Sequence, residues 1–204
     1  MFGISDFGAF AMAFVLLLFL PGPGNLALIS SASKGGLAGG LASVLGLLVG
    51  DQILLWLTVA GMAAILQSFP TLFLIIQWAG AAYLAWLGFK MLTAKAGEGH
   101  HIEITPGHYF RETMTITLLN PKAILFYLAF FPQFIDPVHH QGWITFAVMA
   151  LTIAALGFMY CLGVVLVTHF MAERLRAKPV VSGLLQKLAG VCLIGFSLKL
   201  ALME

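Results

Sequence analysis

The stretch Phe19-Leu20-Pro21-Gly22-Pro23-Gly24-Asn25 interrupts an otherwise continuous apolar run near the start of the chain. Residues 7–20 before it and 26–29 after it have the character of a membrane-spanning helix. The two prolines remove backbone donors and clash with the preceding turn, and the two glycines have little helix propensity. Irregular backbone at membrane depth persists only where protein or a water-filled cavity satisfies it. The break therefore predicts a site or a pathway, with a proline kink that only shapes helix packing as the alternative.

The composition indicates a membrane protein and not a soluble domain. Of the 204 residues, 61% are hydrophobic and only 9% are charged. A spanning helix takes about 20 apolar residues, so six spans need about 120, close to the apolar content of the chain. The apolar residues form long runs and not short alternating segments, which argues against an outer-membrane barrel. The basic residues lie in short loops, which argues against binding of nucleic acid.

We therefore expect an all-α integral membrane protein, with residues 1–204 forming a single transmembrane domain. Six transmembrane helices are predicted at about 7–32, 37–66, 71–93, 110–132, 143–170 and 184–203. The polar loop 94–109 separates two halves, about 1–93 and 110–204. The first helix of each half, and thus helices 1 and 4, is broken at a proline motif. Three spans per half make the halves inverted repeats, an arrangement that places a site near the midplane where the broken helices meet.

The loop charges set the orientation. The loops after the second and fourth spans carry no Lys or Arg, whereas eight of the 10 basic residues lie in or beside the loops after the first, third and fifth. The positive-inside rule predicts that these loops face the cytoplasm, with both termini outside a bacterial-type inner (plasma) membrane. The eight residues are Lys34, Lys90, Lys95, Arg111, Arg174, Arg176, Lys178 and Lys187.

The second span contains Gly36-x-x-x-Gly40 and Gly46-x-x-x-Gly50. Small residues at this spacing let helices approach closely, so we interpret these glycines as packing positions. The glycine-rich composition of these faces also makes a homodimer possible.

Asp51 and Lys122 are the ionisable residues that the sequence places well inside the spans. An insertion penalty of about 2.5–3.5 kcal/mol for each makes a lipid-facing position unfavourable. They can pair with each other, and Lys122 can alternatively snorkel toward the interface. They can also hold a zwitterion, with Lys122 near its carboxylate and Asp51 near its ammonium group. Because an apolar setting favours the neutral form of an acid, Asp51 is also the candidate for proton coupling.

Asn120 and Pro121 have the pattern of an N-cap followed by proline at the first helical position. Asn25 is predicted to play the same part after the first break. Helix starts attract anions, and Lys122 in a first turn opposes the helix dipole unless an anion binds there. The predicted substrate-binding residues are Pro21, Pro23, Asn25, Asp51, Asn120, Pro121 and Lys122.

Two other functions remain open at this point. A divalent-metal exporter is favoured if His100, His101 and His108, with Glu98 and Glu103, bind metal, although their spacing matches no defined site. A membrane scaffold without transport is the second. His-Glu-x-x-His and Gly-x-Ser-x-Gly motifs are absent from the sequence, so we expect no enzyme, no resident metal and no cofactor.

Four short motifs, in order along nearly the whole chain, resemble the LysE/RhtB family of amino-acid exporters. The resemblance implies secondary active export of amino acids or close derivatives from the cytoplasm, by proton antiport with alternating access. It also implies that Pro21, Pro23, Asp51, Asn120, Pro121 and Lys122 are motif positions. Family substrates are diverse, and the glycine after Pro23 leaves the side-chain preference open. The motifs are Pro21-Gly22-Pro23, Gly50-Asp51, Gly80-Ala81-Ala82-Tyr83-Leu84 with Leu87-Gly88, and Asn120-Pro121-Lys122-Ala123.

Overall fold

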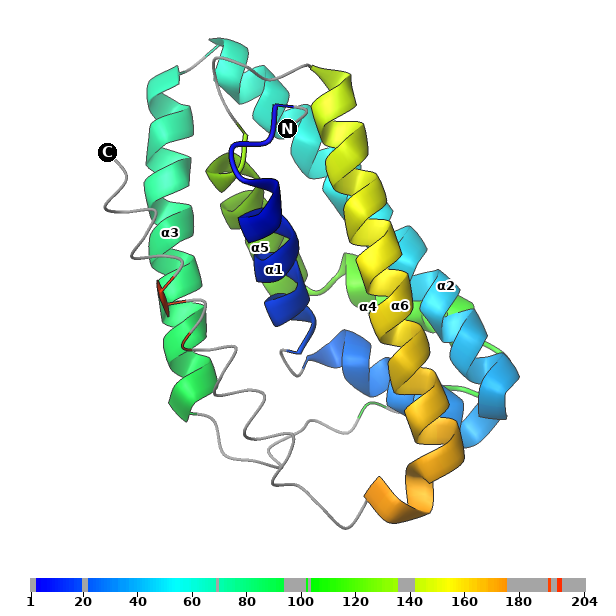
Figure 1. Ribbon diagram of the computed structural model, residues 1–204. Coiled ribbons are helices and arrows are strands. Elements are labelled where there is room, and N and C mark those ends of the chain that lie inside the picture. The colour runs from blue at the N-terminus through cyan, green and yellow to red at the C-terminus, as the bar shows by residue number, and fades with distance from the viewer. Residues whose placement is uncertain are drawn as a thin grey trace.

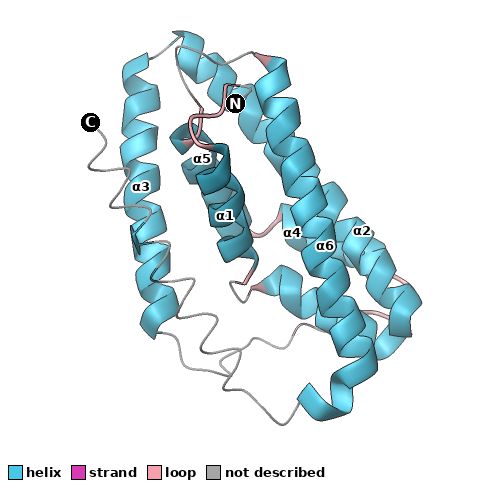
Figure 2. Cartoon of the chain, viewed as in Figure 1, coloured by secondary structure: helices cyan, strands magenta, loops and turns pink. Residues whose placement is uncertain are grey.

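The computed structural model describes residues 3–19, 22–68, 70–93, 102, 104–135, 142–175, 191, 194 and 195. Apart from an isolated antiparallel bridge between Ile4 and Ile135, the regular structure in this part of the chain is helical, as predicted (Figure 2). Most of the predicted sixth span, 184–203, lies outside the described residues. The elements are α1 (Phe7–Leu18), α2 (Pro23–Ser68), α3 (Pro70–Thr93), α4 (Tyr109–Leu118), α5 (Pro121–Phe130), the 3-10 turn η1 (Phe131–Gln133) and α6 (Trp143–Leu175).

Two described stretches are long and apolar enough to cross a membrane. They are Pro23–Gly61 in α2 and Trp143–Phe170 in α6. The helices α4 and α5 are bent by 54° at their junction and make a third crossing segment if the pair is one broken span. The described residues therefore provide two to three candidate spans in an all-helical membrane protein.

Both predicted helix breaks are present. The first separates the end of α1 at Leu18 from the start of α2 at Pro23, and the second separates Leu118 of α4 from Pro121 of α5. Each following helix begins with proline, whose missing N–H and fixed φ suit the first helical position. The breaks thus arise from local sequence, and they create four helix ends whose terminal backbone groups need partners from outside the helix.

The residues that precede these two helices differ. After the second break, the Ile124 amide donates to the Asn120 carbonyl over 3.1 Å, so Asn120 occupies the predicted N-cap position. After the first, the Leu26 amide donates to the Gly22 carbonyl over 3.1 Å. Gly22 is therefore the cap, and the prediction that Asn25 caps this helix was wrong. Pro23 is already suited to the first helical position, so the helix starts before Asn25.

The helix α2 turns sharply at Gly36. This residue has φ 61°, a conformation that glycine adopts without steric cost. A Cβ atom on Gly24 would lie 3.2 Å from Cδ1 of Leu47, although a straight helix would separate these residues by about 35 Å. The chain therefore doubles back within α2, at the turn predicted between the first two spans (Figure 1).

The glycines of the second arm of α2 face neighbouring helices. A Cβ atom on Gly46 would overlap the carbonyl oxygen of Phe110, and one on Gly50 would lie 2.9 Å from Cβ of Thr117. Gly40 faces α6 with equally little room. The interpretation as packing positions is confirmed for Gly40, Gly46 and Gly50, whereas Gly36 serves the turn. The most extensive contacts of α2 are with α4 and then α6.

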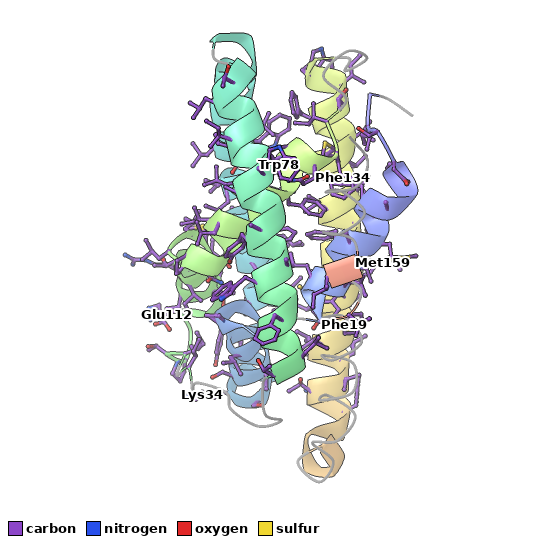
Figure 3. The ribbon with its side chains drawn as sticks, turned by 90° about the vertical axis from the view of Figure 1, so that its left-hand side faces the viewer. Phe19, Lys34, Trp78, Glu112, Phe134 and Met159 are labelled. Atoms are coloured by element: carbon purple, nitrogen blue, oxygen red, sulfur yellow. The ribbon has the colours of Figure 1, made fainter. Side chains whose placement is uncertain are left out.

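An aromatic core joins α1 to α5 and η1. The Phe10 ring lies 5.4 Å from the rings of both Phe130 and Phe134, and Phe126 stacks on Phe130 at 4.6 Å. The helix α3 runs along one side of the molecule and contacts α5 (Figure 3). This core fixes the position of α5, which carries one wall of the cavity described below.

The end of the polar loop is attached to the turn in α2. The Lys34 ammonium donates to the Ile104 carbonyl over 3.3 Å, and the Thr105 amide donates to the Glu112 carboxylate over 2.9 Å. The Tyr109 ring packs against the glycines on either side of the turn. Lys34 and Glu112 accordingly lie near each other on one side of the molecule (Figure 3), beside the two loops that were predicted to face the cytoplasm.

Candidate functional site

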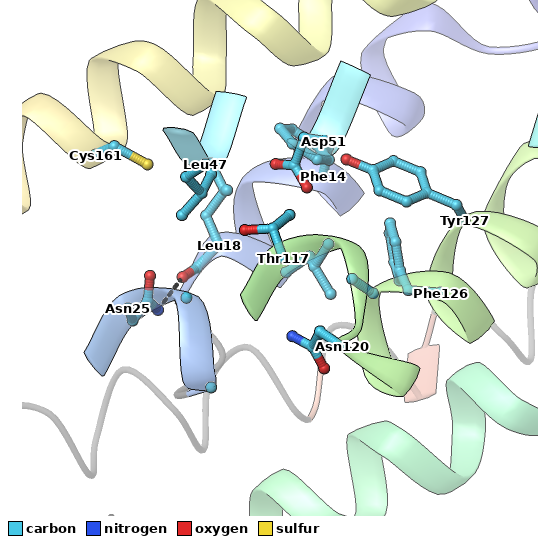
Figure 4. A pocket seen from close by; sticks show the side chains of 14 residues that line it. Phe14, Leu18, Asn25, Leu47, Asp51, Thr117, Asn120, Phe126, Tyr127 and Cys161 are labelled. Atoms are coloured by element: carbon cyan, nitrogen blue, oxygen red, sulfur yellow. Dashed lines mark hydrogen bonds between the residues drawn. The ribbon is translucent and has the colours of Figure 1, made fainter. Parts of the chain in front are cut away.

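The two helix breaks open onto one cavity of about 110 Å³. Its walls come from α1, α2, α4, α5 and α6, so it collects residues that are far apart in the sequence (Figure 4). Most of the lining is apolar, with Phe14, Leu17, Leu47 and Phe126 among its larger members. An apolar wall with a few polar groups is the usual composition of a small-molecule site. The polar lining residues are Asn25, Asp51, Thr117, Asn120, Tyr127 and Cys161.

Asn25 bridges the first break. Its side-chain amide donates to the Leu18 carbonyl over 3.1 Å and to the Tyr160 hydroxyl over 3.3 Å. The Leu18 carbonyl is one of the groups that the end of α1 leaves without a helical partner, and the Asn25 amide supplies one. The Tyr160 ring in turn packs edge-on against Phe19 at 5.4 Å. Asn25 therefore lines the cavity while it holds α1, α2 and α6 together.

Asp51 brings a carboxyl group to the cavity from α2. It lies one helical turn after Leu47, so both side chains share the face that borders the cavity. The hydroxyl of Tyr127 on α5 points toward this carboxyl group, within reach of a hydrogen bond. Tyr127 is only 2% exposed, and its ring stacks on Phe131 at 5.8 Å. The contact joins the second helix of one predicted half to the broken helix of the other.

The second break contributes backbone as well as side chains. Asn120 and Ala123 line the cavity beside Thr117, whose hydroxyl donates to the Thr113 carbonyl over 3.0 Å. The starts of α2 and α5 therefore border the cavity together with the ends of α1 and α4. Helix starts carry partial positive charge and helix ends partial negative charge, so the site offers both signs without many charged side chains.

Three of the predicted substrate-binding residues, Asn25, Asp51 and Asn120, meet at this cavity. Pro23 and Pro121 begin the adjoining helices, and neither is among the residues that line the cavity. Pro121 is exposed. The prolines thus shape the site through the backbone and not through their own side chains.

Two predicted residues cannot be placed at the cavity. Pro21 and the side chain of Lys122 lie outside the part of the chain that the structure describes. The pairing of Asp51 with Lys122, and the contact of Lys122 with an anion, therefore stay predictions.

Sequence reasoning missed Tyr127, Thr117 and Cys161. Asn120, Ala123 and Tyr127 are spaced i, i+3 and i+7, which places them on one helical face. That spacing was the available signal for Tyr127. Thr117 and Cys161 carry no comparable signal, because their directions depend on how α4 and α6 pack.

The metal-exporter alternative gains no support. Among the described residues, no three His, Cys, Asp or Glu side chains lie close enough to hold a metal ion. His108 is described and exposed, whereas His100 and His101 lie outside the described residues.

Comparison with known proteins gives a consistent result along the whole chain. Residues 15–204 match the protein family described as LysE type translocator. The leucine efflux protein of Klebsiella pneumoniae is 30% identical over 207 residues, which cover 100% of this chain and 98% of the relative. The leucine efflux protein of an Enterobacter species is 32% identical over 204 residues, 98% of this chain and 97% of the relative.

No solved structure matches the chain. The resemblance drawn from the four motifs is confirmed by the family match and the full-length relatives. The chain therefore belongs to the LysE family of translocators, and is a membrane transporter of the amino-acid efflux type and not an enzyme.

Proposed function

We propose that the protein exports an amino acid with an apolar side chain, such as leucine, from the cytoplasm through the cavity between the two helix breaks. The observation that carries this proposal is the meeting of one carboxyl group, from Asp51, with four helix ends inside an apolar wall. The names of the relatives, which are leucine efflux proteins, support the class of substrate.

Each part of a zwitterion finds a complementary part of the site. The substrate carboxylate lies toward the starts of α2 and α5, where backbone N–H groups and Lys122 attract an anion. The ammonium group lies at Asp51. The side chain packs against Phe14, Leu47 and Phe126. A basic side chain would need a second acid, and Asp51 is the one acid among the described lining residues.

Export proceeds by alternating access. The cavity of about 110 Å³ is smaller than one of about 150 Å³ that holds benzene, so a leucine has little room in it. The cavity must widen for loading and release, and the two breaks provide helix ends that can separate without unwinding a helix.

Proton entry drives the cycle. Ionised Asp51 binds the substrate ammonium from the cytoplasm, and a proton arriving from outside neutralises Asp51 and releases the substrate. Exchange of a zwitterion for one proton moves one positive charge inward. A potential of 100 mV supplies about 2.3 kcal/mol for this charge, which is roughly forty-fold accumulation.

The full architecture in this proposal has six transmembrane helices as two inverted three-helix repeats, with both termini outside the inner membrane. It is supported by the breaks, which border one cavity from opposite halves of the chain. It is also supported by the attachment of the polar loop to the Lys34 turn, because both carry predicted cytoplasmic charges. A homodimer through glycine-rich faces is a further part of the proposal.

Counterflow in proteoliposomes tests the proposed function. Vesicles loaded with a panel of unlabelled amino acids are assayed for uptake of the labelled compound, with and without a pH step. We expect accelerated leucine exchange that Asp51→Asn abolishes and that Glu112→Gln, the corresponding acid-to-amide change outside the cavity, retains. No accelerated exchange for any amino acid, or undiminished proton-coupled exchange in Asp51→Asn, would contradict the proposal.

A further inference from the structure

The hydroxyl of Tyr127 points toward the Asp51 carboxyl group, and both residues line the cavity (Figure 4). The aromatic ring of Tyr127 is held in place by its neighbours. The ring is buried, stacks on Phe131 at 5.8 Å and meets Phe126 edge-on at 5.7 Å. A rigid aromatic ring with a polar tip is suited to fix the position of another group.

We propose that Tyr127 is the positioning residue that holds the Asp51 carboxyl group toward the cavity, so that the ammonium group of an amino-acid substrate finds it in place. This inference rests on the proposed function and adds to it the residue through which Asp51 recognises the ammonium group. Tyr127 itself acts through Asp51 and not on the substrate.

The chemistry of the two groups fits this role. A carboxylate has about four acceptor positions, so one hydrogen bond from Tyr127 leaves the others for the substrate ammonium. A hydroxyl can both donate and accept. The contact can therefore persist when Asp51 carries a proton, with the acid donating and the Tyr127 oxygen accepting. Asp51 keeps one orientation through both halves of the transport cycle.

Among the described lining residues of α1, α4 and α6, no side chain offers a comparable contact. Cys161 on α6 lines the same cavity, and its thiol is only a weak donor. The α1 wall presents Phe14 and Leu17, and the Thr117 hydroxyl of α4 is engaged by the Thr113 carbonyl.

The test compares Tyr127→Phe with Tyr160→Phe in the purified full chain. Both variants lose one tyrosine hydroxyl beside the cavity, but the Tyr160 hydroxyl contacts Asn25 and not Asp51. Three probes compete with labelled leucine: unlabelled leucine, isoamylamine, which keeps only the ammonium group, and isocaproate, which keeps only the carboxylate.

We expect Tyr127→Phe to weaken leucine and isoamylamine binding by about tenfold, the lower end for a hydrogen bond to a charged group. Isocaproate binding should stay within twofold of wild type. Tyr160→Phe should not separate the two analogues. Equal weakening of both analogues in Tyr127→Phe would show a structural role and overturn the inference, as would unchanged leucine binding. A wild-type protein from which isoamylamine displaces no leucine would also overturn it.

A second measurement decides the matter if Tyr127→Phe does not accumulate. The infrared difference spectrum of the wild-type protein on addition of leucine should show a tyrosine band changing together with the carboxylate bands. A carboxylate change without a tyrosine change would overturn the inference. The variant Asp51→Asn distinguishes a failure of the proposed function from a failure of the inference about Tyr127. If Asp51→Asn still binds leucine, the proposed site is wrong. If Asp51→Asn loses leucine binding and Tyr127→Phe keeps it, only the role of Tyr127 is wrong.

Discussion

Replacing Gly46 with alanine is expected to push α2 away from α4. An alanine Cβ atom would overlap the carbonyl oxygen of Phe110, which belongs to the α4 backbone and cannot rotate away. Overpacking of this kind costs about 1–3 kcal/mol, and a backbone neighbour places it near the upper end. Alanine regains about 1 kcal/mol in helix propensity. The net expectation is a loss of about 2 kcal/mol in the free energy of unfolding.

The matched control is Gly61→Ala on the same helix. No heavy atom among the described residues lies within 4 Å of a Cβ atom built there. This variant keeps only the propensity gain, about 1 kcal/mol. The two variants should therefore differ by about 3 kcal/mol, or roughly 6–12 °C in melting temperature for a chain of this size.

Thermal melts of the purified variants in one detergent measure this difference. A Gly46→Ala protein that melts at or above the temperature of Gly61→Ala would refute the reasoning. It would mean that α2 and α4 do not meet as closely as the overlap at Phe110 indicates.

Two further predictions concern the same helix. Ser43 and Thr113 share a buried hydrogen bond of 2.7 Å, so Ser43→Ala or Thr113→Val alone should cost about 1–2 kcal/mol while the double variant is nearly neutral. Chemical denaturation measures this, and fully additive losses would contradict it. Gly24→Ala would place a Cβ atom 3.2 Å from Leu47 at the cavity, which should raise the half-saturation concentration for leucine by about tenfold and that for alanine by less. The control is Gly163→Ala, at a site with open space in the described structure, which should transport both amino acids as the wild type does. Equal effects of Gly24→Ala and Gly163→Ala would contradict the placement of the leucine side chain beside Gly24.

The helix breaks and the close helix contacts could be predicted because both depend on local chemistry. Proline fixes where α2 and α5 begin, and the small-residue spacing marks where α2 approaches its neighbours. Asp51 could be assigned to the site because an ionisable group inside an apolar span is unfavourable unless it has a function or a partner.

The rest of the cavity could not be predicted because its helices are apolar all round. Periodicity then cannot separate a face toward the core from a face toward lipid. Cys161 lies in such a run, so its direction follows from the packing of α6 and not from a local pattern. For Asn25, a local signal was misleading. Asparagine is a strong capping residue and was therefore predicted to start the helix, but the helix already begins at Pro23.

The single amide of Asn25 ties three chain segments together at the first break. It bonds the end of α1 through the Leu18 carbonyl and α6 through the Tyr160 hydroxyl, from its own place in α2. A rearrangement that parted α1 from α6 at this point would have to break one of these two bonds. Distance probes attached to α1 and α6 beside Asn25 should therefore report whether both bonds persist when the protein transports its substrate.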